Sequence, residues 1–240
     1  MNITGKTDIG RLRRANQDAF CCGELPGNAV YAVVCDGMGG ANGGDIASSN
    51  AVKIIKDYVE SSYREDMNSN SVKALLQSSM CGANVRLHDI ARTIPSLSGM
   101  GTTAVAVIVS ENIAHIAHLG DSRAYLIRGG EITQITKDHS VVQSMVDCGQ
   151  ITKEQARNHP RKNVITRALG IKSEIEAEYN EIDFFEDDKL LICSDGLTNY
   201  VEDAKIAEVL SNNSENAAET LINLANEAGG GDNITLVIIS

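Results

Sequence analysis

The chain has 240 residues, 42% of them hydrophobic, and no segment that resembles a linker, so we predict a single domain over residues 1–240. Its net charge of −11 would repel nucleic-acid phosphates and anionic lipids, and we expect neither as a partner. The six cysteines form no C-x-x-C pair, and the sequence contains neither a signal region nor a run of ~18 apolar residues. These features predict a cytoplasmic protein with reduced thiols.

The first hundred residues are predicted to form short strands followed by two long helices. Val33 to Cys35 ends an apolar run that stops at Asp36, where glycines follow at 37, 39 and 40. Apolar residues at helical spacing then predict one helix from about Asp45, and a second that begins after a cap at Ser71 and ends before Pro95. The expected strands in this half are 3–8, 19–22 and 29–35, with a turn at 26–28.

The rest of the chain begins as a series of strands joined by short turns. Connections this short require antiparallel neighbours, because a parallel pair needs a crossover of a dozen or more residues. Residues 137–172 are less regular and are typical of a lid or binding segment. The expected strands are 103–109, 113–119, 124–127, 132–135, 189–193 and 234–239, and the expected helices are 141–146, 153–158, 203–210 and 215–228. This order predicts an α+β fold in which two antiparallel β-sheets form a central sandwich with helices packed outside.

The stretch around Asp36 has three interpretations. Asp-Gly is a common turn dipeptide, and a strand followed by glycines and a helix also resembles a dinucleotide-binding fingerprint. The fingerprint fits poorly, because Asn42 stands where its third glycine belongs and Asp36 would direct a negative charge at the pyrophosphate. The antiparallel strands that follow also argue against a Rossmann sheet. The third interpretation is a metal ligand held at the end of a buried strand.

Five acids lie at predicted strand edges beside turn residues, and this shared setting favours the metal interpretation. Carboxylates that converge without basic partners repel one another unless a cation neutralises them. A site made of oxygen ligands, without clustered Cys or His, points to Mg²⁺ or Mn²⁺. The five acids are Asp18, Asp36, Asp121, Asp195 and Asp232. Three arginines, at 11, 13 and 14, form a basic spot shortly before Asp18 in the sequence. A solvated loop is the default explanation for such a run of charges.

Seven motifs spread over almost the whole chain resemble, in order and spacing, those of the bacterial metal-dependent Ser/Thr protein phosphatases of type 2C. Any one of these motifs alone would be weak evidence, whereas seven in the same order are specific. They are Arg13-x-x-Asn16-x-Asp18, Asp36-Gly37-Met38-Gly39-Gly40, Gly101-Thr102-Thr103, Gly120-Asp121-Ser122-Arg123, Ile165-Thr166-Arg167-Ala168-Leu169-Gly170, Ser194-Asp195-Gly196-Leu197 and Asp232-Asn233-Ile234-Thr235.

The resemblance implies helices on both faces of the sandwich and a centre of two Mn²⁺ or Mg²⁺ ions in a cleft at one end, beside a flap at about 137–172. It implies that Asp36 bridges the two ions, that the carbonyl of Gly37 binds one of them, and that Asp195 and Asp232 complete the other. Asp18 would act mainly through metal-bound water, Asp121 would join Asp195 at a weaker third site, and Asn233 would support the ligands. Arg13 would bind the substrate phosphate, which replaces its interpretation as a solvated loop residue.

The resemblance further implies a monomeric hydrolase that removes phosphate from phosphoserine and phosphothreonine in proteins and opposes a bacterial Ser/Thr kinase. Water activated by the two ions would attack phosphorus, so no cysteine is needed as nucleophile. Many relatives carry histidine just after the Asp-Gly or the Gly-Gly, whereas this chain has Met38 and Ala41. Metal-bound water is then the first candidate for the general acid and His139 the second, while His115 and His118 are expected to be strand residues. A phosphoprotein-binding regulator without turnover is the alternative from another class, and a dinucleotide-dependent oxidoreductase ranks below it.

Overall fold

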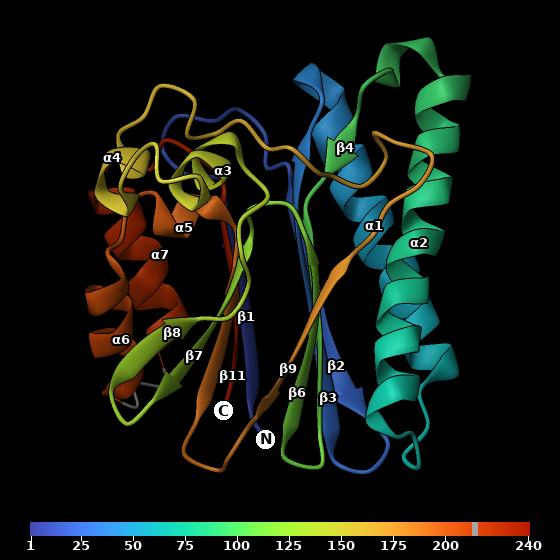
Figure 1. The fold of residues 1–240 in the computed structure, drawn as a ribbon, viewed down its shortest axis with the longest axis vertical. Helices are drawn as coiled ribbons and strands as arrows, with labels where there is room; N and C mark the ends of the chain where they lie inside the picture. Colours follow the sequence, from blue (N-terminus) through green and yellow to red (C-terminus); the bar gives the residue numbers. More distant parts are fainter. Residues whose placement is uncertain (213–215) are drawn as a thin grey trace.

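The computed structural model describes residues 1–212 and 216–240, and at residues 40–42 it describes the backbone alone. Two antiparallel sheets pack face to face, with helices outside each of them (Figure 1). This is the predicted α+β sandwich with helices on both faces. Within the described residues, no helix combines the length and the apolar character that crossing a membrane requires.

The first sheet has the strand order β1-β11-β10-β7-β8, and α6 and α7 cover its outer face (Figure 1). Its long-range pairs join the two ends of the chain, since β1 pairs with β11 from Ile3↔Ile239 to Asp8↔Ile234. The bounds are β1 Ile3–Asp8, β7 Arg123–Arg128, β8 Glu131–Gln134, β10 Lys189–Cys193, β11 Ile234–Ile239, α6 Asp203–Ser211 and α7 Ala217–Glu227.

The second sheet has the order β2-β3-β5-β6-β9, with β4 paired to the end of β3, and α1 and α2 cover its outer face. The remaining short helices, η1 and α3 to α5, lie in connections. The bounds are β2 Asp18–Leu25, β3 Ala29–Met38, β4 Gly101–Thr102, β5 Ala104–Ser110, β6 Ile113–Leu119, β9 Glu178–Asp183, α1 Gly40–Ser62, α2 Ser69–Thr93, η1 Pro95–Leu97, α3 Val141–Asp147, α4 Lys153–Arg157 and α5 Asp195–Thr198.

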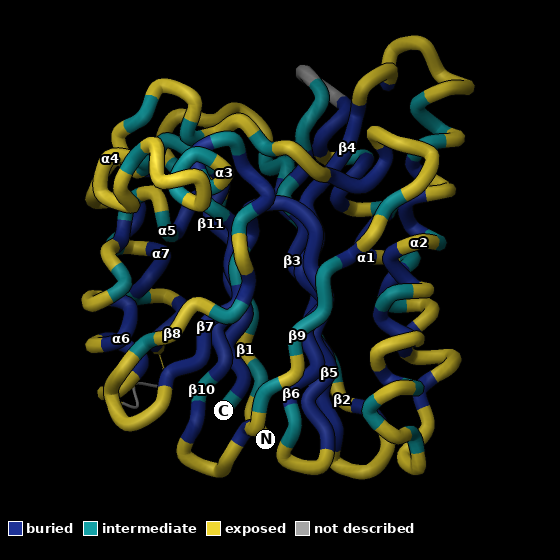
Figure 2. The backbone as a smooth tube through the Cα atoms, in the orientation of Figure 1, coloured by how far each residue is buried: buried dark blue, intermediate teal, exposed yellow. Residues whose placement is uncertain are grey.

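Strand β3 explains why its sequence is apolar without alternation. Val30, Ala32 and Val34 pack between the two sheets, whereas Tyr31 and Val33 pack against α1 and α2. A strand covered on both faces has no solvent side, so every second residue cannot be polar. Along the whole sandwich, buried residues lie at the centre, and exposed residues lie in the loops and on the outer surfaces of the helices (Figure 2).

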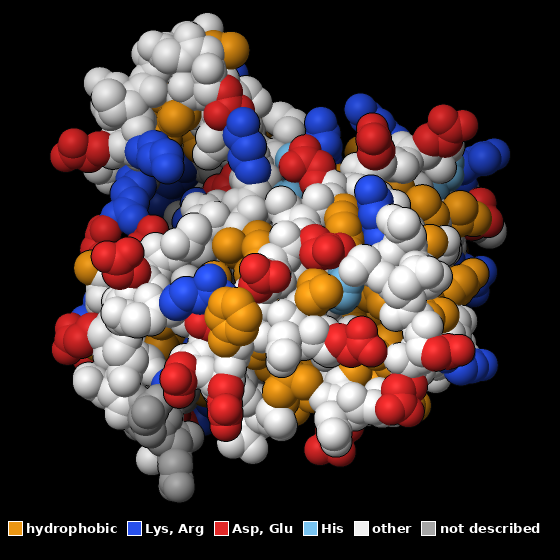
Figure 3. Space-filling model, turned by 60° about the horizontal axis from the view of Figure 1, so that its bottom comes forward, with side chains coloured by type: hydrophobic (Ala, Val, Ile, Leu, Met, Phe, Trp, Pro, Cys, Tyr) orange, Lys and Arg blue, Asp and Glu red, His pale blue; other side chains and the backbone are white. Residues whose placement is uncertain are grey.

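The two ends of the sandwich differ in what they expose. The termini lie at one end, where acidic side chains are dispersed among neutral and hydrophobic ones (Figure 3). The other end carries β4, α5 and the segment with α3 and α4 (Figure 1). The strand-end acids of the sequence therefore point to this second end as the functional one.

Some predicted elements were wrong in their bounds or were missed. Ser71 is not the cap of α2, because Asn68 precedes the helix and its side chain accepts a hydrogen bond from the Ser71 amide. Helix α1 begins at Gly40, before the predicted Asp45, and β9 and α5 were not predicted. The predicted start of the last helix, residue 215, lies outside the described residues. All six cysteines are free, as expected.

Candidate metal centre

Four of the five predicted acids line one cleft of about 560 Å³, and the fifth lies directly behind it. Asp36, Asp121, Asp195 and Asp232 line this cleft together with Arg13. They arrive from the end of β3, the β6–β7 turn, the start of α5 and the residue pair before β11. Asp18 is the first residue of β2 and lies opposite Asp36 in the register of the β2–β3 hairpin. Acids separated by up to 214 residues are thus brought together by sheet pairing.

The backbone of Asp36 is fixed by Thr102 and Thr103, which lie where β4 passes into β5. Its N–H donates to Thr103 Oγ1 at 2.9 Å, and its carbonyl accepts from Thr102 Oγ1 at 2.8 Å and from the Thr103 amide at 2.8 Å. Thr103 Oγ1 also lies 2.7 Å from Ser122 Oγ, beside Asp121. These hydroxyl residues belong to recognised motifs but had no predicted role, and their position next to the acids is the signal that could have revealed one.

Gly37 can only be glycine because another backbone passes close to its Cα. A Cβ at this position would lie 1.9 Å from the carbonyl oxygen of Gly44 and 2.7 Å from that of Gln17. The Gly37 amide donates to the same Gln17 carbonyl at 3.0 Å. The absent side chain lets the start of α1 pack against the end of β3, and Gly37 itself lines the cleft beside Asp36.

The carboxylates of Asp18 and Asp195 are each only half satisfied. Ser194 Oγ donates to Asp18 Oδ2 at 2.7 Å, and Asn199 Nδ2 donates to Asp195 Oδ2 at 2.8 Å. The second oxygen of each carboxylate, Oδ1, is buried and has no hydrogen-bond partner among the described residues. A buried acceptor without a partner is costly, and such oxygens are what a hard cation binds. The residues present therefore fit a divalent metal.

The electrostatics of the cluster support the same conclusion. Burial, with repulsion from Asp195 and Asp232 added to it, raises the pKa of Asp18 from 3.8 to about 7. Burial also raises the pKa of Asp36 well above its ordinary value, and the charges of Asp18, Asp195, Asp121 and Asp232 raise it further. The pKa of Asp121 is raised mainly by burial and then by Asp195. A cation in the cleft would offset this repulsion.

Arg13 and Asn233 form the wall of the cleft beside Asp232. Arg13 Nη2 donates to Asp232 Oδ2 at 2.8 Å, and the arginine side chain remains 47% exposed, so part of its guanidinium group is open to a ligand. Asn233 accepts from the Gln17 amide at 2.8 Å and donates to the carbonyls of Ile9 and Ala15 at 2.9 and 3.0 Å. Asn233 thus clamps the loop that carries Arg13.

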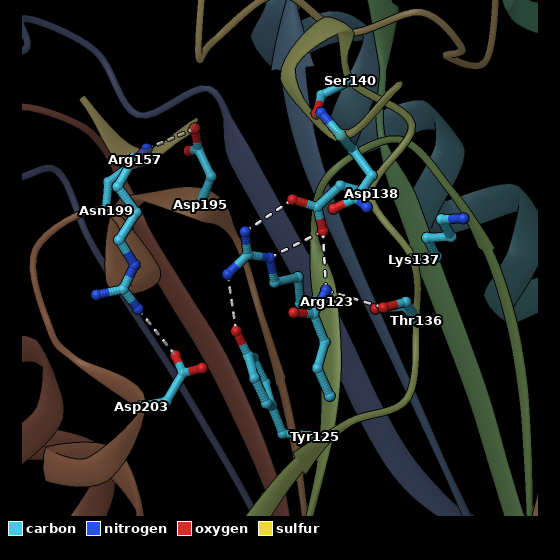
Figure 4. Close-up of polar contacts among 12 residues, drawn as sticks. Arg123, Tyr125, Thr136, Lys137, Asp138, Ser140, Arg157, Asp195, Asn199 and Asp203 are labelled. Atoms are coloured by element: carbon cyan, nitrogen blue, oxygen red, sulfur yellow. Dashed lines mark hydrogen bonds and ion pairs between the residues drawn. The ribbon is translucent and has the colours of Figure 1, made fainter. Parts of the chain in front are cut away.

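A second cleft, of about 550 Å³, shares Asp121 and Asp195 with the first. It lies between the segment with α3 and α4, which belongs to the predicted flap at 137–172, and the start of α6 (Figure 4). In its wall Arg123 donates to both carboxylate oxygens of Asp138, at 2.9 and 2.7 Å, and to the Tyr125 hydroxyl at 2.8 Å. Figure 4 also shows the contact between Asn199 and Asp195 at the edge of this cleft.

The histidines do not reach the acids. His139, the second candidate for the general acid, is buried and is not among the described residues that line the cleft. His115 and His118 are buried on β6, in agreement with their expected place in a strand. Met38 lines the cleft and has no proton to give, while the side chain of Ala41 lies outside the described residues.

Comparison with known proteins gives one consistent family. The family model described as protein phosphatase 2C matches residues 11–227. The chain is 37% identical to the serine/threonine phosphatase stp of Listeria monocytogenes over 244 residues, which cover all of this chain and 95% of that protein. The solved serine/threonine phosphatase of S. agalactiae superposes with a TM-score of 0.92 at 34% identity and covers 99% of this chain and 98% of its own. The catalytic domain of PstP, solved in complex with two manganese ions, gives a TM-score of 0.86 at 34% identity and covers 99% of this chain and 96% of its own.

Proposed function

Since the chain belongs to the protein phosphatase 2C family and is a divalent-metal-dependent serine/threonine protein phosphatase, we propose that its reaction takes place in the cleft around Asp36. The single observation that carries this proposal is the convergence of four buried or half-buried acids and one partly exposed arginine in that cleft. The substrates are phosphoserine and phosphothreonine residues of proteins.

We assign the metal ligands to the acids whose oxygens face this cleft. Asp36 and the carbonyl of Gly37 would hold one cation, and Asp36, Asp195 and Asp232 would hold the other, with Asp18 behind them. Asp121 and Asp195 line both clefts, which makes them the pair for a weaker third cation. Two bound divalent cations would lower the pKa of a water and orient it for in-line attack on phosphorus. Mn²⁺ and Mg²⁺ both suit an all-oxygen site, and the manganese-bound PstP structure favours Mn²⁺.

Arg13 binds the phosphoryl group from the wall beside Asp232. Its guanidinium group presents a planar set of donors that matches phosphate oxygens. The hydrogen bond to Asp232 fixes its direction, and its exposed part can compensate charge on the equatorial oxygens as the serine or threonine oxygen leaves. Asn233 keeps the loop of Arg13 in place through its two donated hydrogen bonds.

The partners we propose are phosphoproteins of the cytoplasm and a bacterial Ser/Thr kinase whose products this enzyme hydrolyses. Six free cysteines suit a reducing compartment, which supports action in the cytoplasm. We propose that the chain acts as a monomer, because each residue of the assigned site comes from one chain.

The test is hydrolysis of an aryl phosphate and of a phosphothreonine peptide by the wild-type chain and by Asp36→Asn and Asp195→Asn. We expect activity that EDTA abolishes and Mn²⁺ restores, and a loss of at least ~100-fold in both variants, since several kcal/mol of charge stabilisation disappear with a ligand. Asp66→Asn, an exposed acid between α1 and α2, is the matched control and should keep full activity. Undiminished hydrolysis by Asp36→Asn in metal-free buffer would contradict the proposal.

A further inference from the structure

The flap is joined to the body of the protein at a narrow neck. Ser140 pairs with Ile165 in an isolated bridge, and the Val141 amide donates to the Val164 carbonyl at 2.9 Å. One residue before this bridge, the His139 carbonyl accepts from the Thr166 amide at 2.7 Å. The chain between 140 and 165, which includes α3 and α4, therefore leaves and returns through one short ladder at the top of the sandwich (Figure 1).

His139 connects this neck to the turn that carries Asp121. Its backbone amide donates to the Gly120 carbonyl at 2.9 Å, and its ring atom Nδ1 accepts from the Gly120 amide at 3.0 Å. Both polar groups of the Gly120 backbone are thus held by one residue, immediately before Asp121. Gly120 itself has φ +111 and no side chain that could fix the turn.

The hydrogen bonds of the His139 ring also define its protonation. Because Nδ1 accepts from an amide, the ring proton of the neutral imidazole is on Nε2. Nε2 lies 3.0 Å from Glu178 Oε1 on β9, and Arg167, two residues past the neck, donates to the same oxygen at 3.1 Å. Glu178 therefore binds both sides of the neck, and His118 stacks on the His139 ring with centroids 4.8 Å apart.

This cluster is built from hydrogen bonds and does not suit a further cation. Ligand atoms of His118, His139 and Glu178 lie within 4.8 Å of one another, a spacing that a metal could use. To bind a cation, His139 would have to offer a lone pair on Nε2. Its other ring nitrogen, Nδ1, already accepts from the Gly120 amide, so Nε2 carries the ring proton and has no free lone pair. A cation would also have to displace the Arg167 guanidinium from Glu178. The cluster serves instead to orient the His139 ring.

We propose that His139 is a positioning residue that holds Asp121 as a cation ligand and links that ligand to the neck of the flap. The proposal rests on the function proposed above. Asp121 is buried and shares two clefts with Asp195, so two like charges face each other there unless a cation is bound. The two hydrogen bonds between His139 and Gly120 resist the displacement of the turn that this repulsion favours. Cation affinity at Asp121 consequently depends on a side chain that does not line the cleft.

Two variants of equal polarity separate this role from a general structural one. In His139→Asn the side-chain oxygen replaces Nδ1 and can still accept from the Gly120 amide. In His139→Gln the amide group reaches toward Glu178 instead, and the acceptor for Gly120 is lost. Mn²⁺ binding is measured by titration calorimetry and electron paramagnetic resonance, and amide hydrogen exchange at Gly120 and Asp121 is measured without metal.

We expect the weakest class of Mn²⁺ sites to lose affinity about tenfold in His139→Gln, the lower end of the effect of removing a group that orients a ligand. His139→Asn should stay within about threefold of the wild-type chain, because it keeps the hydrogen bond. Exchange at Gly120 should accelerate about fivefold in His139→Gln, which corresponds to the net free energy of one hydrogen bond. Hydrolysis of an aryl phosphate at saturating Mn²⁺ should be unchanged in both.

Other outcomes overturn the proposal. Equal loss of the weak Mn²⁺ class in both variants would show a general packing effect, and wild-type affinity in His139→Gln would show that Asp121 does not depend on His139. A wild-type chain that binds two Mn²⁺ ions and no third would also refute the proposal, but would leave the proposed function intact. A wild-type chain that neither binds Mn²⁺ nor hydrolyses the aryl phosphate would refute both.

Discussion

Replacing Asp18 by Asn should stabilise the metal-free protein at neutral and alkaline pH. Asp18 is almost fully buried, and one of its oxygens has no partner among the described residues. Burial, together with the charges of Asp195 and Asp232, raises the pKa of Asp18 from 3.8 to about 7. The folded state therefore binds the proton more tightly than the unfolded state, and folding stability falls as the pH rises from about 4 to about 7. Asparagine keeps the shape of the side chain and removes this charge.

The size of the effect follows from the two pKa values. Each pKa unit corresponds to 1.36 kcal/mol, so ionising Asp18 destabilises the folded state by up to about 4 kcal/mol at pH 8 and by about 2 kcal/mol at pH 5. Urea unfolding of EDTA-treated protein at both pH values measures the difference between the wild-type chain and Asp18→Asn. Excess Mn²⁺ should reduce the advantage of the variant, because cation binding stabilises the folded wild-type chain.

A matched control has the opposite sign. Asp188 is also buried, but Arg128 donates to both of its oxygens at 2.8 and 2.6 Å and lowers its pKa. Asp188→Asn should therefore destabilise the metal-free protein at pH 8, and less so as the pH falls through the lowered pKa. The reasoning fails if Asp18→Asn is no more stable than the wild-type chain at pH 8, or if its gain is the same at pH 5.

Two further changes test the walls of the cleft. Arg13→Lys keeps the charge and loses the planar donor pair, so kcat/KM for an aryl phosphate should fall about tenfold with little change in Mn²⁺ affinity; an unchanged kcat/KM would contradict phosphate binding by Arg13. Gly37→Ala should abolish hydrolysis and lower the melting temperature, because its Cβ would lie 1.9 Å from the Gly44 carbonyl oxygen. Gly99 is the control, because it has φ +79 and an added Cβ would meet no atom within 4 Å. Gly99→Ala should therefore lose only about 1 kcal/mol of stability and keep its activity. Equal behaviour of the two variants in melting and hydrolysis assays would show that the close approach at Gly37 is unimportant.

One contact of the candidate site follows from the register of a single hairpin. The turn predicted at 26–28 lies between Leu25 and Ala29, which pair in the structure, whereas the first strand of this hairpin was predicted to end at residue 22. Antiparallel register then places Asp18 opposite Asp36, since side-chain pairing is fixed by the turn length. This pair needs no knowledge of the second sheet, and it accounts for the first of the repulsive charges that act on Asp36.

The other acids could be recognised as strand-end residues, but their meeting could not be derived in the same way. Asp232 and Asp195 reach the cleft because β11 pairs with β10 and with β1, and the pairing with β1 joins the two ends of the chain. No local pattern encodes which strands pair at such separations, so the resemblance to a family supplied what periodicity could not. Helix α1 begins before the predicted Asp45 and includes Gly44, where an added Cβ would lie only 2.7 Å from the Gly37 carbonyl oxygen, so the helix start packs closely against the end of β3.

Strand β9 was missed because its sequence lacks a continuous apolar face. It is an edge strand whose one partner among the described strands is β6, and four of its six residues are polar or acidic. One of those acids, Glu178, makes the contact with His139, so the element that local propensity describes least well is the one that orients the neck of the flap. Polar residues on an edge strand serve contacts beyond the sheet, which hydrophobic periodicity does not report.

The charge balance at the cleft explains why stability and function oppose each other here. Arg13 is the only basic side chain hydrogen-bonded to any of the five acids among the described residues, and it contacts Asp232, which is half-buried. The Asp18 carboxylate accepts from the Ser194 hydroxyl, which holds it in place without neutralising it, and Asp36 is fixed through its backbone N–H, which donates to the Thr103 hydroxyl. Replacing any of these aspartates by asparagine should make the metal-free fold more stable and the metal-bound enzyme less active. A cluster selected for stability alone would not keep five carboxylates, so their retention is itself an argument that a cation is the missing partner.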